Sequence, residues 1–297
     1  MNNPIAFYKD KFDLQEATFL KIEHKDALVA IVYKINQANH KEYILKICPR
    51  YPDYLCEIYF LNNLVNKLPV PHIYKTIDQT EDTYGAILME YLPGNLPKKT
   101  DLTRALMFEI GALLAKIHSN KVVGYGNLTQ SNLLSLNPTS YFTLKFEEGI
   151  AECSNNMPGK LLNSCCHFYN QHVHLLGSVD GPCITHRDFR PGNILVNKGK
   201  VSGIIDWSSA RGSFAEEDFC SLELGEWTNN PELKINFLKG YESIRKVPDY
   251  FKVMPCLLLS KAIATIGFTV KTGTWSNKNA RLYQRSRRLL ERILEIN

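Results

Sequence analysis

The feature that most constrains the fold is a pair of short apolar runs separated by a polar turn. Residues 194–196 and 201–205 are rich in Ile, Leu and Val, and the polar residues 197–200 lie between them. Apolar runs of this length joined by a short polar turn predict a β-hairpin. Because Asn193 directly precedes the first strand and Asp206 directly follows the second, both are expected at the same end of the hairpin.

The register of this hairpin determines how close the two polar side chains come. If the turn pairs Val196 with Val201, counting back along both strands puts Asn193 opposite Ile204. Asp206 then lies just beyond the strand end, beside Asn193. An amide oxygen and a carboxylate brought together in this way form an oxygen-rich site that suits Mg²⁺, which takes phosphate and water as its other ligands.

An aspartate on the preceding loop completes the pattern. Asp188 lies five residues before Asn193 and two after His186, which gives the spacing HxDxxxxN. A carboxylate there is placed as a base near a metal-held phosphate, which describes phosphoryl transfer. The alternative interpretation, in which His186 and Asp188 form a capped turn and Asp206 is a solvated strand end, needs three polar residues to reach consistent geometry by accident.

On these residues the chain resembles the aminoglycoside phosphotransferase and choline kinase-like superfamily, which shares the protein kinase fold. Residues 185–196 read THRDFRPGNILV and residues 203–207 read GIIDW. Protein kinases would instead carry Asp-Phe-Gly at the metal aspartate and a later Ala-Pro-Glu; neither follows, so a small-molecule acceptor is expected. Asp218 falls where the family carries a second, structural aspartate. Further family-like segments extend the resemblance over most of the chain, at residues 68–71, 88–94 and 114–118.

Hydrophobic patterning divides the chain into two regions. From Phe19 to about Met89 the pattern predicts β-strands, interrupted by one helix at residues 55–68. The predicted strands lie at residues 27–35, 43–48 and 86–89. After Pro93 the periodicity is helical, most clearly at residues 101–120.

Together with the resemblance, this order predicts an α+β protein with a two-lobed, protein kinase-like fold. A small antiparallel β-sheet lobe, residues 1–92, is expected to bind nucleotide. A larger, mainly α-helical lobe, residues 93–297, is expected to carry catalysis and substrate binding.

The nucleotide lobe offers an ion pair of its own. Strand alternation puts Lys46 on the opposite face from Leu45 and Ile47, where its ammonium can point into the cleft between the lobes. Glu57 shares the apolar stripe of the following helix, so its carboxylate borders the buried face and can hold Lys46. The resemblance implies the same pair, with Lys46 on the α- and β-phosphates of ATP or GTP.

Further nucleotide contacts are implied by the resemblance. The connection Met89–Leu92 would follow the adenine edge, with Glu90 and Leu92 supplying a backbone carbonyl and a backbone amide. The loop between the first two strands reads EHKDA and lacks the glycine or small polar residues that the family usually has there. Either Lys25 contacts phosphate through its side chain, or nucleotide binding is weak.

The mechanism expected from these residues is in-line transfer of a γ-phosphoryl group. Mg²⁺ held by Asn193 and Asp206 bridges the ATP phosphates, while Asp188 orients the acceptor hydroxyl and accepts its proton. Arg190 is expected to stabilise charge on the transferred group, as a Lys at that position does in protein kinases.

The acceptor is expected to be a small hydroxyl-bearing molecule. Many family substrates are cationic amino alcohols, and a group of acidic and aromatic residues follows the metal strand. The candidate substrate residues are Glu216, Glu217, Glu223, Glu226 and Trp227. Aminoglycosides are the first expectation; choline, ethanolamine or another small alcohol is the second. The alternative for these residues is a solvated acidic face with a core tryptophan.

A function of another class is also compatible with the sequence. A nucleotide-binding pseudokinase that acts as an interaction module is favoured by the missing glycine loop. It is disfavoured by the complete set of charged residues that the chemistry requires, since Lys46, Asp188, Asn193 and Asp206 are all present.

Charge and hydropathy limit the remaining partners. The formal net charge of +5 is too small to indicate nucleic acid, and +4 of it falls between Lys278 and the chain end, where six basic and two acidic residues lie on a predicted amphipathic helix. Residues 253–270 are interrupted by a proline and a lysine, so a buried helix is expected there and no membrane contact. We expect a cytoplasmic protein, monomeric or homodimeric.

The cysteines predict packing rather than metal binding. None of the eight forms a CxxC pair, and the cluster of cysteine and histidine at residues 165–174 lies on an apolar stripe with helical spacing. Structural zinc sites usually place paired ligands around a loop, which is absent here.

Overall fold

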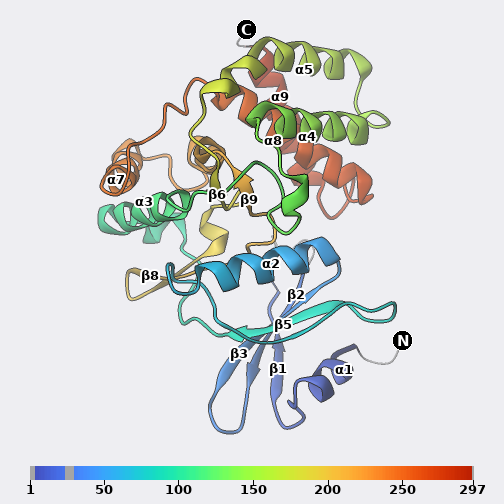
Figure 1. The fold of residues 1–297 in the computed structure, drawn as a ribbon, viewed down its shortest axis with the longest axis vertical. Coiled ribbons are helices and arrows are strands. Elements are labelled where there is room, and N and C mark those ends of the chain that lie inside the picture. Colours follow the sequence, from blue (N-terminus) through green and yellow to red (C-terminus); the bar gives the residue numbers. More distant parts are fainter. Residues whose placement is uncertain (1–3, 24–29, 296–297) are drawn as a thin grey trace.

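The computed structural model describes residues 4–23 and 30–295. Figure 1 shows an antiparallel sheet at one end of the molecule, the longer helices at the other, and helix α2 (Tyr51–Leu64) lying between them. The α+β, two-lobed architecture expected from the sequence is confirmed.

The sheet has five strands in the order β1-β2-β3-β5-β4, and every neighbouring pair is antiparallel. Its strands are β1 (Thr18–Lys21), β2 (Ile31–Asn36), β3 (Glu42–Cys48), β4 (Ile73–Ile77) and β5 (Gly85–Glu90). Strand β3 is central, and Lys46 on it pairs with Val32 on one side and Ile87 on the other. The lysine is therefore fixed at the middle of the sheet.

Strand alternation separates the two faces of β3 as expected. Leu45 and Ile47 are buried in a small core with Tyr8 and with other residues at and after helix α1 (Pro4–Lys11). Lys46 points to the opposite face, which α2 covers. Residues of α2 at three- and four-residue spacing, Phe60 and Leu64 among them, are buried and place that helix against the second part of the protein.

The second part is mainly helical. Its longer helices are α3 (Arg104–His118), α4 (Pro138–Cys153), α5 (Gly159–His172), α7 (Pro231–Glu242), α8 (Met254–Lys271) and α9 (Ala280–Glu295). Helix α3 begins where the Thr103 hydroxyl accepts a hydrogen bond from the Leu106 amide, at 3.2 Å, which caps the helix and starts it three residues later than predicted.

Helices α3 and α7 approach so closely that only glycine fits at two positions. A Cβ atom on Gly111 would lie 1.9 Å from the Phe237 carbonyl oxygen, and one on Gly240 would lie 1.9 Å from the Phe108 carbonyl oxygen. This close pair supports the loop that carries the predicted catalytic residues, because α3 also packs on strand β6 (Cys183–Thr185).

The predicted hairpin is present as β7 (Ile194–Asn197) and β8 (Lys200–Ile204). Val196 pairs with Val201 as expected, but an irregularity between Leu195 and Val196 shifts the register by one residue. Ile194, not Asn193, therefore pairs with Ile204. Asn193 instead accepts a hydrogen bond from the Ile205 amide, at 3.0 Å, so it still lies at the end of the hairpin from which Asp206 follows.

The apolar segment near residue 260 is a core helix. Helix α8 is long and apolar enough to cross a membrane by length and composition, but it packs against α4 and α9 and half of it is buried. In residues 4–23 and 30–295, no group of three or more His, Cys, Asp or Glu side chains is arranged to hold a metal ion. The cysteine- and histidine-rich segment forms α5, in which Cys165 is buried, and all eight cysteines are free thiols.

Candidate active site

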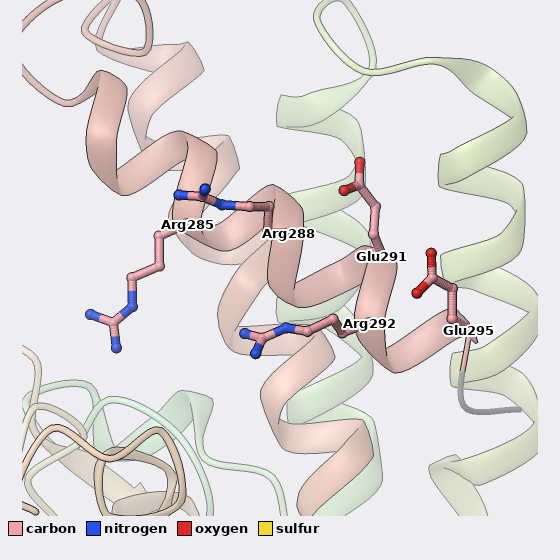
Figure 2. A pocket seen from close by; sticks show the side chains of 5 residues that line it. All are labelled: Arg285, Arg288, Glu291, Arg292 and Glu295. Carbon is pink, nitrogen blue, oxygen red and sulfur yellow. The ribbon is translucent and has the colours of Figure 1, made fainter. Parts of the chain in front are cut away.

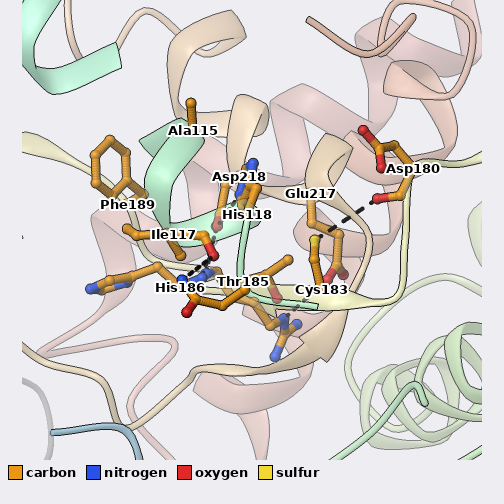
Figure 3. A network of polar contacts seen from close by, with 12 residues as sticks. Ala115, Ile117, His118, Asp180, Cys183, Thr185, His186, Phe189, Glu217 and Asp218 are labelled. Atoms are coloured by element: carbon orange, nitrogen blue, oxygen red, sulfur yellow. Dashed lines mark hydrogen bonds and ion pairs between the residues drawn. The ribbon is translucent and has the colours of Figure 1, made fainter. Parts of the chain in front are cut away.

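A buried aspartate holds the loop that precedes the hairpin. Asp218 accepts hydrogen bonds from the amides of His186, at 2.8 Å, and Arg187, at 2.5 Å. Its carboxylate also lies 3.1 Å from His118 Nε2, which must carry the proton because a carboxylate only accepts. Figure 3 shows His118 and Asp218 meeting beside His186, so one side chain joins α3 to the loop. This arrangement agrees with the structural part expected for Asp218.

The network continues behind His118. Its Nδ1 lies 2.9 Å from the Tyr241 hydroxyl on α7. Burial alone would raise the pKa of Asp218, but the hydrogen bonds from His118 and from the loop amides outweigh it and lower the pKa below the ordinary value. Arg187, held between these bonds and Asp188, has a φ of 64°, a backbone conformation that a non-glycine residue keeps only where its surroundings impose it.

The orientation of Asp188 is set by two neighbours on the same loop. Arg190 Nε lies 3.0 Å from both carboxylate oxygens, and Asn193 Nδ2 lies 2.7 Å from Oδ2. The arginine folds over Gly192, where a Cβ atom would approach its Nη1 to 2.2 Å. The carboxylate of Asp188 remains one-third exposed, so it is oriented yet accessible.

Asp206 follows β8 and is linked directly to the sheet. Its Oδ1 accepts hydrogen bonds from Lys46 Nζ, at 2.8 Å, and from the Ser208 hydroxyl, at 2.9 Å. With a φ of 64°, Asp206 turns the chain sharply at the end of the hairpin. The positive charge of Lys46 lowers the pKa of Asp206, so this carboxylate is ionised at neutral pH.

Lys46 is buried and held by two carboxylates, one on helix α2 and one just after strand β8. Glu57 Oε2, on α2, lies 2.9 Å from Lys46 Nζ. The same nitrogen lies 2.8 Å from Asp206 Oδ1. Although burial opposes the charge on Lys46, Asp206 and Glu57 raise its pKa, which keeps the ammonium charged. Three residues far apart in the sequence therefore meet at the boundary between the sheet and the helical part.

The connection after β5 packs on the hairpin. Met89 is buried, and the Glu90 amide donates to the His72 carbonyl oxygen at 2.8 Å. The side chain of Leu92 packs on Gly203 of the hairpin, where a Cβ atom would lie 2.6 Å from the leucine Cδ1. Lys25, the expected phosphate contact, lies outside the described residues.

The first two glutamates expected to bind the acceptor are used inside the protein. Both oxygens of Glu216 accept from the Asp180 amide, at 3.0 and 3.2 Å, and only 3% of the residue is exposed. Glu217 is buried and pairs with Arg211 Nη2 at 2.6 Å. These side chains support the loop and have no free face toward a ligand, because burial and internal partners occupy them.

The other acceptor candidates are occupied as well. Glu223 pairs with Lys234 at 2.7 Å and accepts from the Tyr250 hydroxyl at 2.9 Å. Glu226 lies 3.4 Å from Arg285 on α9. The expectation that Trp227 contacts the acceptor is wrong, because the ring is fully buried and its Nε1 donates to the Phe189 carbonyl oxygen at 3.3 Å.

Three residues of this network were not expected from the sequence. Ser208, two residues after Asp206, could have been found from that spacing, since a hydroxyl so placed can reach back to a carboxylate. Tyr241 carries no local signal, because its partner His118 lies 123 residues away. Arg211 lies on strand β9 (Arg211–Ser213) and its partner Glu217 in the 3-10 helix that follows, a six-residue spacing that belongs to neither a helix nor a strand face.

The chain is similar to known phosphotransferases. Residues 29–256 match the phosphotransferase enzyme family. A homoserine kinase from Gluconobacter oxydans (strain 621H) is 28% identical over 188 residues, which cover 60% of this chain and 56% of that protein. The chain thus spans little more than half the length of this curated relative.

Solved structures show the fold over nearly the whole chain. A thermostable mutant of aminoglycoside phosphotransferase APH(4)-Ia, in complex with AMP-PNP and hygromycin B, superposes with a TM-score of 0.76 at 13% identity, covering 98% of this chain and 97% of that one. The gentamicin complex of APH(2")-IIa gives a TM-score of 0.69 at 17% identity, covering 98% and 96%.

The two-lobed fold is shared with these aminoglycoside phosphotransferases. The chain belongs to the phosphotransferase enzyme family, as the match over most of its length shows.

Proposed function

We propose that this protein transfers the γ-phosphoryl group of ATP or GTP to a hydroxyl group of a small molecule. The observation that carries the proposal is the 2.8 Å contact between Lys46 and Asp206. It places Lys46, the proposed phosphate-binding cation of the sheet, against Asp206, the proposed metal-binding carboxylate after the hairpin. Asp188 lies on the loop that precedes the same hairpin.

We propose that the sheet and the connection after strand β5 bind the nucleotide. Lys46 contacts the α- and β-phosphates, and Glu57 is a positioning residue that keeps its ammonium in place. Met89, Glu90 and Leu92 follow the adenine edge, with backbone groups of Glu90 and Leu92 as its partners. Lys25 is the proposed side-chain contact to phosphate.

The residues at the hairpin end fit a magnesium ion. Asn193 uses its amide nitrogen to bond Asp188, so its amide oxygen is the group left for a cation. Asp206 is ionised and 44% of its side chain is exposed. Amide and carboxylate oxygens are the donors that Mg²⁺ prefers, and the ion would neutralise charge on the phosphates.

The transfer step needs a base and an oriented acceptor. Asp188 accepts the proton of the acceptor hydroxyl, whose oxygen forms a bond to the γ-phosphorus as the bond to the leaving phosphate oxygen breaks. Arg190 and Asn193 fix the direction of the carboxylate, so the base is aligned before the acceptor binds. Arg190 also adds positive charge beside the transferred group.

The acceptor class is tested with a broad panel. Relatives act on or bind homoserine, hygromycin B and gentamicin. The panel therefore contains aminoglycosides, choline, ethanolamine and homoserine, together with neutral and anionic alcohols, and ADP release is measured for each with Mg²⁺. We expect Asp188→Asn and Asp206→Asn to abolish ADP release with any acceptor that turns over.

The matched control is Asp249→Asn, which removes the charge of an exposed carboxylate paired with Lys252. It should leave turnover unchanged. Undiminished turnover in Asp188→Asn or Asp206→Asn would contradict the proposal. ATP binding without metal dependence, and no ADP release with any acceptor, would favour a pseudokinase instead.

A further inference from the structure

The two oxygens of the Asp206 carboxylate have different surroundings. Oδ1 accepts two hydrogen bonds, one from Lys46 Nζ at 2.8 Å and one from the Ser208 hydroxyl at 2.9 Å. Within residues 4–23 and 30–295, no side chain or amide donates to Oδ2. Because 44% of the Asp206 side chain is exposed, a ligand can reach this carboxylate. One oxygen is therefore occupied by donors of the protein, and the other is left for a ligand.

The lysine by itself does not select between the two oxygens. A carboxylate rotates about its Cβ–Cγ bond in a broad, two-fold torsion, and an ammonium is a compact charge that attracts either oxygen. Lys46 Nζ is also shared with Glu57 Oε2, at 2.9 Å. The Ser208 hydroxyl has a single proton, which it donates to Asp206 Oδ1. The serine is thus the donor that serves this one oxygen.

The backbone holds Ser208 in position on both sides. Asp206 has a φ of 64°, which turns the chain sharply, and the next residue, Trp207, is fully buried with its Nε1 donating to the Ile204 carbonyl oxygen at 3.1 Å. On the far side of the serine, the Ala210 amide donates to the Trp207 carbonyl oxygen at 3.0 Å. The Ala210 carbonyl oxygen in turn accepts from the Cys56 thiol of α2, at 3.1 Å. The hydroxyl is therefore placed by the fold before any ligand binds.

A carboxylate that offers one oxygen distinguishes between divalent cations. Mg²⁺ requires nearly octahedral geometry, which single oxygens satisfy, whereas Ca²⁺ also accepts both oxygens of one carboxylate. Asn193 offers one oxygen as well, because its amide nitrogen donates to the carbonyl oxygen and to Oδ2 of Asp188, at 2.8 and 2.7 Å. The donors at the hairpin end are therefore one amide oxygen and one carboxylate oxygen, a set that suits the smaller ion.

We propose that Ser208 is a positioning residue for the metal ion: together with Lys46 it holds Oδ1 of Asp206 and leaves Oδ2 as the single oxygen that binds the ion. This inference rests on the proposed phosphotransferase function and identifies what selects Mg²⁺ over Ca²⁺ at that site. Hydrogen bonds to ligating carboxylates orient them, and removing one typically lowers metal affinity by about 10- to 100-fold.

The test measures binding, so that it does not depend on turnover. The affinity of the full chain for AMP-PNP is determined by calorimetry with Mg²⁺, with Ca²⁺ and with EDTA, and circular dichroism verifies folding. We expect the unchanged protein to bind AMP-PNP more tightly with Mg²⁺ than with Ca²⁺. Ser208→Ala should weaken binding with Mg²⁺ by about tenfold, weaken it less with Ca²⁺, and leave binding in EDTA unchanged.

The chain offers a matched control at the next position. Ser209 is exposed, and its hydroxyl makes no hydrogen bond with the part of the chain that the structure describes. Ser209→Ala should therefore bind AMP-PNP as the unchanged protein does in all three conditions. Ser208→Thr keeps a hydroxyl and should retain most of the affinity with Mg²⁺. Unchanged affinity with Mg²⁺ in Ser208→Ala, or an equal loss in all three conditions, would overturn the proposal.

The outcomes separate this inference from the proposed function. Binding of AMP-PNP that depends on Mg²⁺ and on Ser208, without ADP release from any acceptor of the panel, would support the role of Ser208 and contradict phosphoryl transfer. ADP release together with unchanged Mg²⁺-dependent binding in Ser208→Ala would overturn the role of Ser208 alone. AMP-PNP binding to the unchanged protein that is the same with Mg²⁺ and with EDTA would contradict both.

Discussion

Two groups of carboxylates flank the catalytic loop and differ in what surrounds them. Asp188 and Asp206 are one-third and 44% exposed, and each keeps part of its carboxylate accessible. Glu216, Glu217 and Asp218 are less than a tenth exposed, and each is bonded to amides, an arginine or a histidine of the protein. Both groups consist of carboxylates, so the difference between them lies in burial and in internal partners. These decide which group can contact a ligand and which one supports the loop.

The largest expected effect is on the accessible group. Asp206→Asn removes the charge that binds Lys46 and that would hold a metal ion, so turnover should fall by at least roughly a thousandfold. The rate of ADP release measures this, with circular dichroism to verify folding. If the variant kept its turnover, Asp206 would belong with the supporting carboxylates and the comparison would fail.

The buried group should respond in stability first. Asp218→Ala leaves two loop amides and His118 without their acceptor, and we expect a loss of about 4 kcal/mol in the free energy of unfolding. Urea denaturation measures the loss. Asp218→Asn keeps one acceptor oxygen and should cost about half as much, and an unchanged midpoint in both variants would show that the loop is held by other contacts.

A pH dependence distinguishes Glu216 from the rest. Burial raises its pKa to about 7 in the folded protein, from 4.5 for the free side chain. The folded state therefore binds a proton that the unfolded state has lost between these values, and stability should fall by about 3 kcal/mol as the pH rises from 4.5 to 7. Glu216→Gln should lack this decrease. Parallel pH profiles of unfolding for the two proteins would contradict it.

The smallest expected effect concerns Glu226, the most exposed of the four glutamates. Its pair with Arg285 is partly solvated, so Glu226→Gln should change the free energy of unfolding by less than about 1 kcal/mol. Urea denaturation of the variant and of the unchanged protein measures the difference. A loss of several kcal/mol would show that this glutamate belongs with the buried, supporting carboxylates.

The residues proposed to transfer the phosphoryl group could be predicted, because the pattern that points to most of them lies within one short segment. Asp188, Asn193 and Asp206 lie within 19 residues, and hairpin geometry alone brings two of them to one end. Even there the register was wrong by one residue, since the unpaired Ser202 between Val201 and Gly203 is not encoded by apolar alternation. Lys46 and Glu57 were also predictable, because strand and helix periodicities give their faces.

The partners of the acceptor-side glutamates could not be predicted in this way. Glu216 is bonded to an amide 36 residues away, and Glu226 is paired with an arginine 59 residues away on the last helix. A cluster of acidic residues in the sequence therefore suggested a cation site. In the folded protein, internal partners occupy these glutamates instead, and Glu216 and Glu217 support the loop. The basic helix packs on α8 through its apolar face and leaves Arg281, Arg285, Arg288 and Arg292 exposed, as its amphipathic pattern predicts (Figure 2).

The sequence by itself determined the fold class, the hairpin and the residues proposed for phosphoryl transfer, because each follows from periodicity or from spacing within a short segment. Only the tertiary structure decided which charges are neutralised and which remain available. Ion pairs and desolvation depend on distances between segments far apart in the chain, and short-range patterns contain no information about those distances.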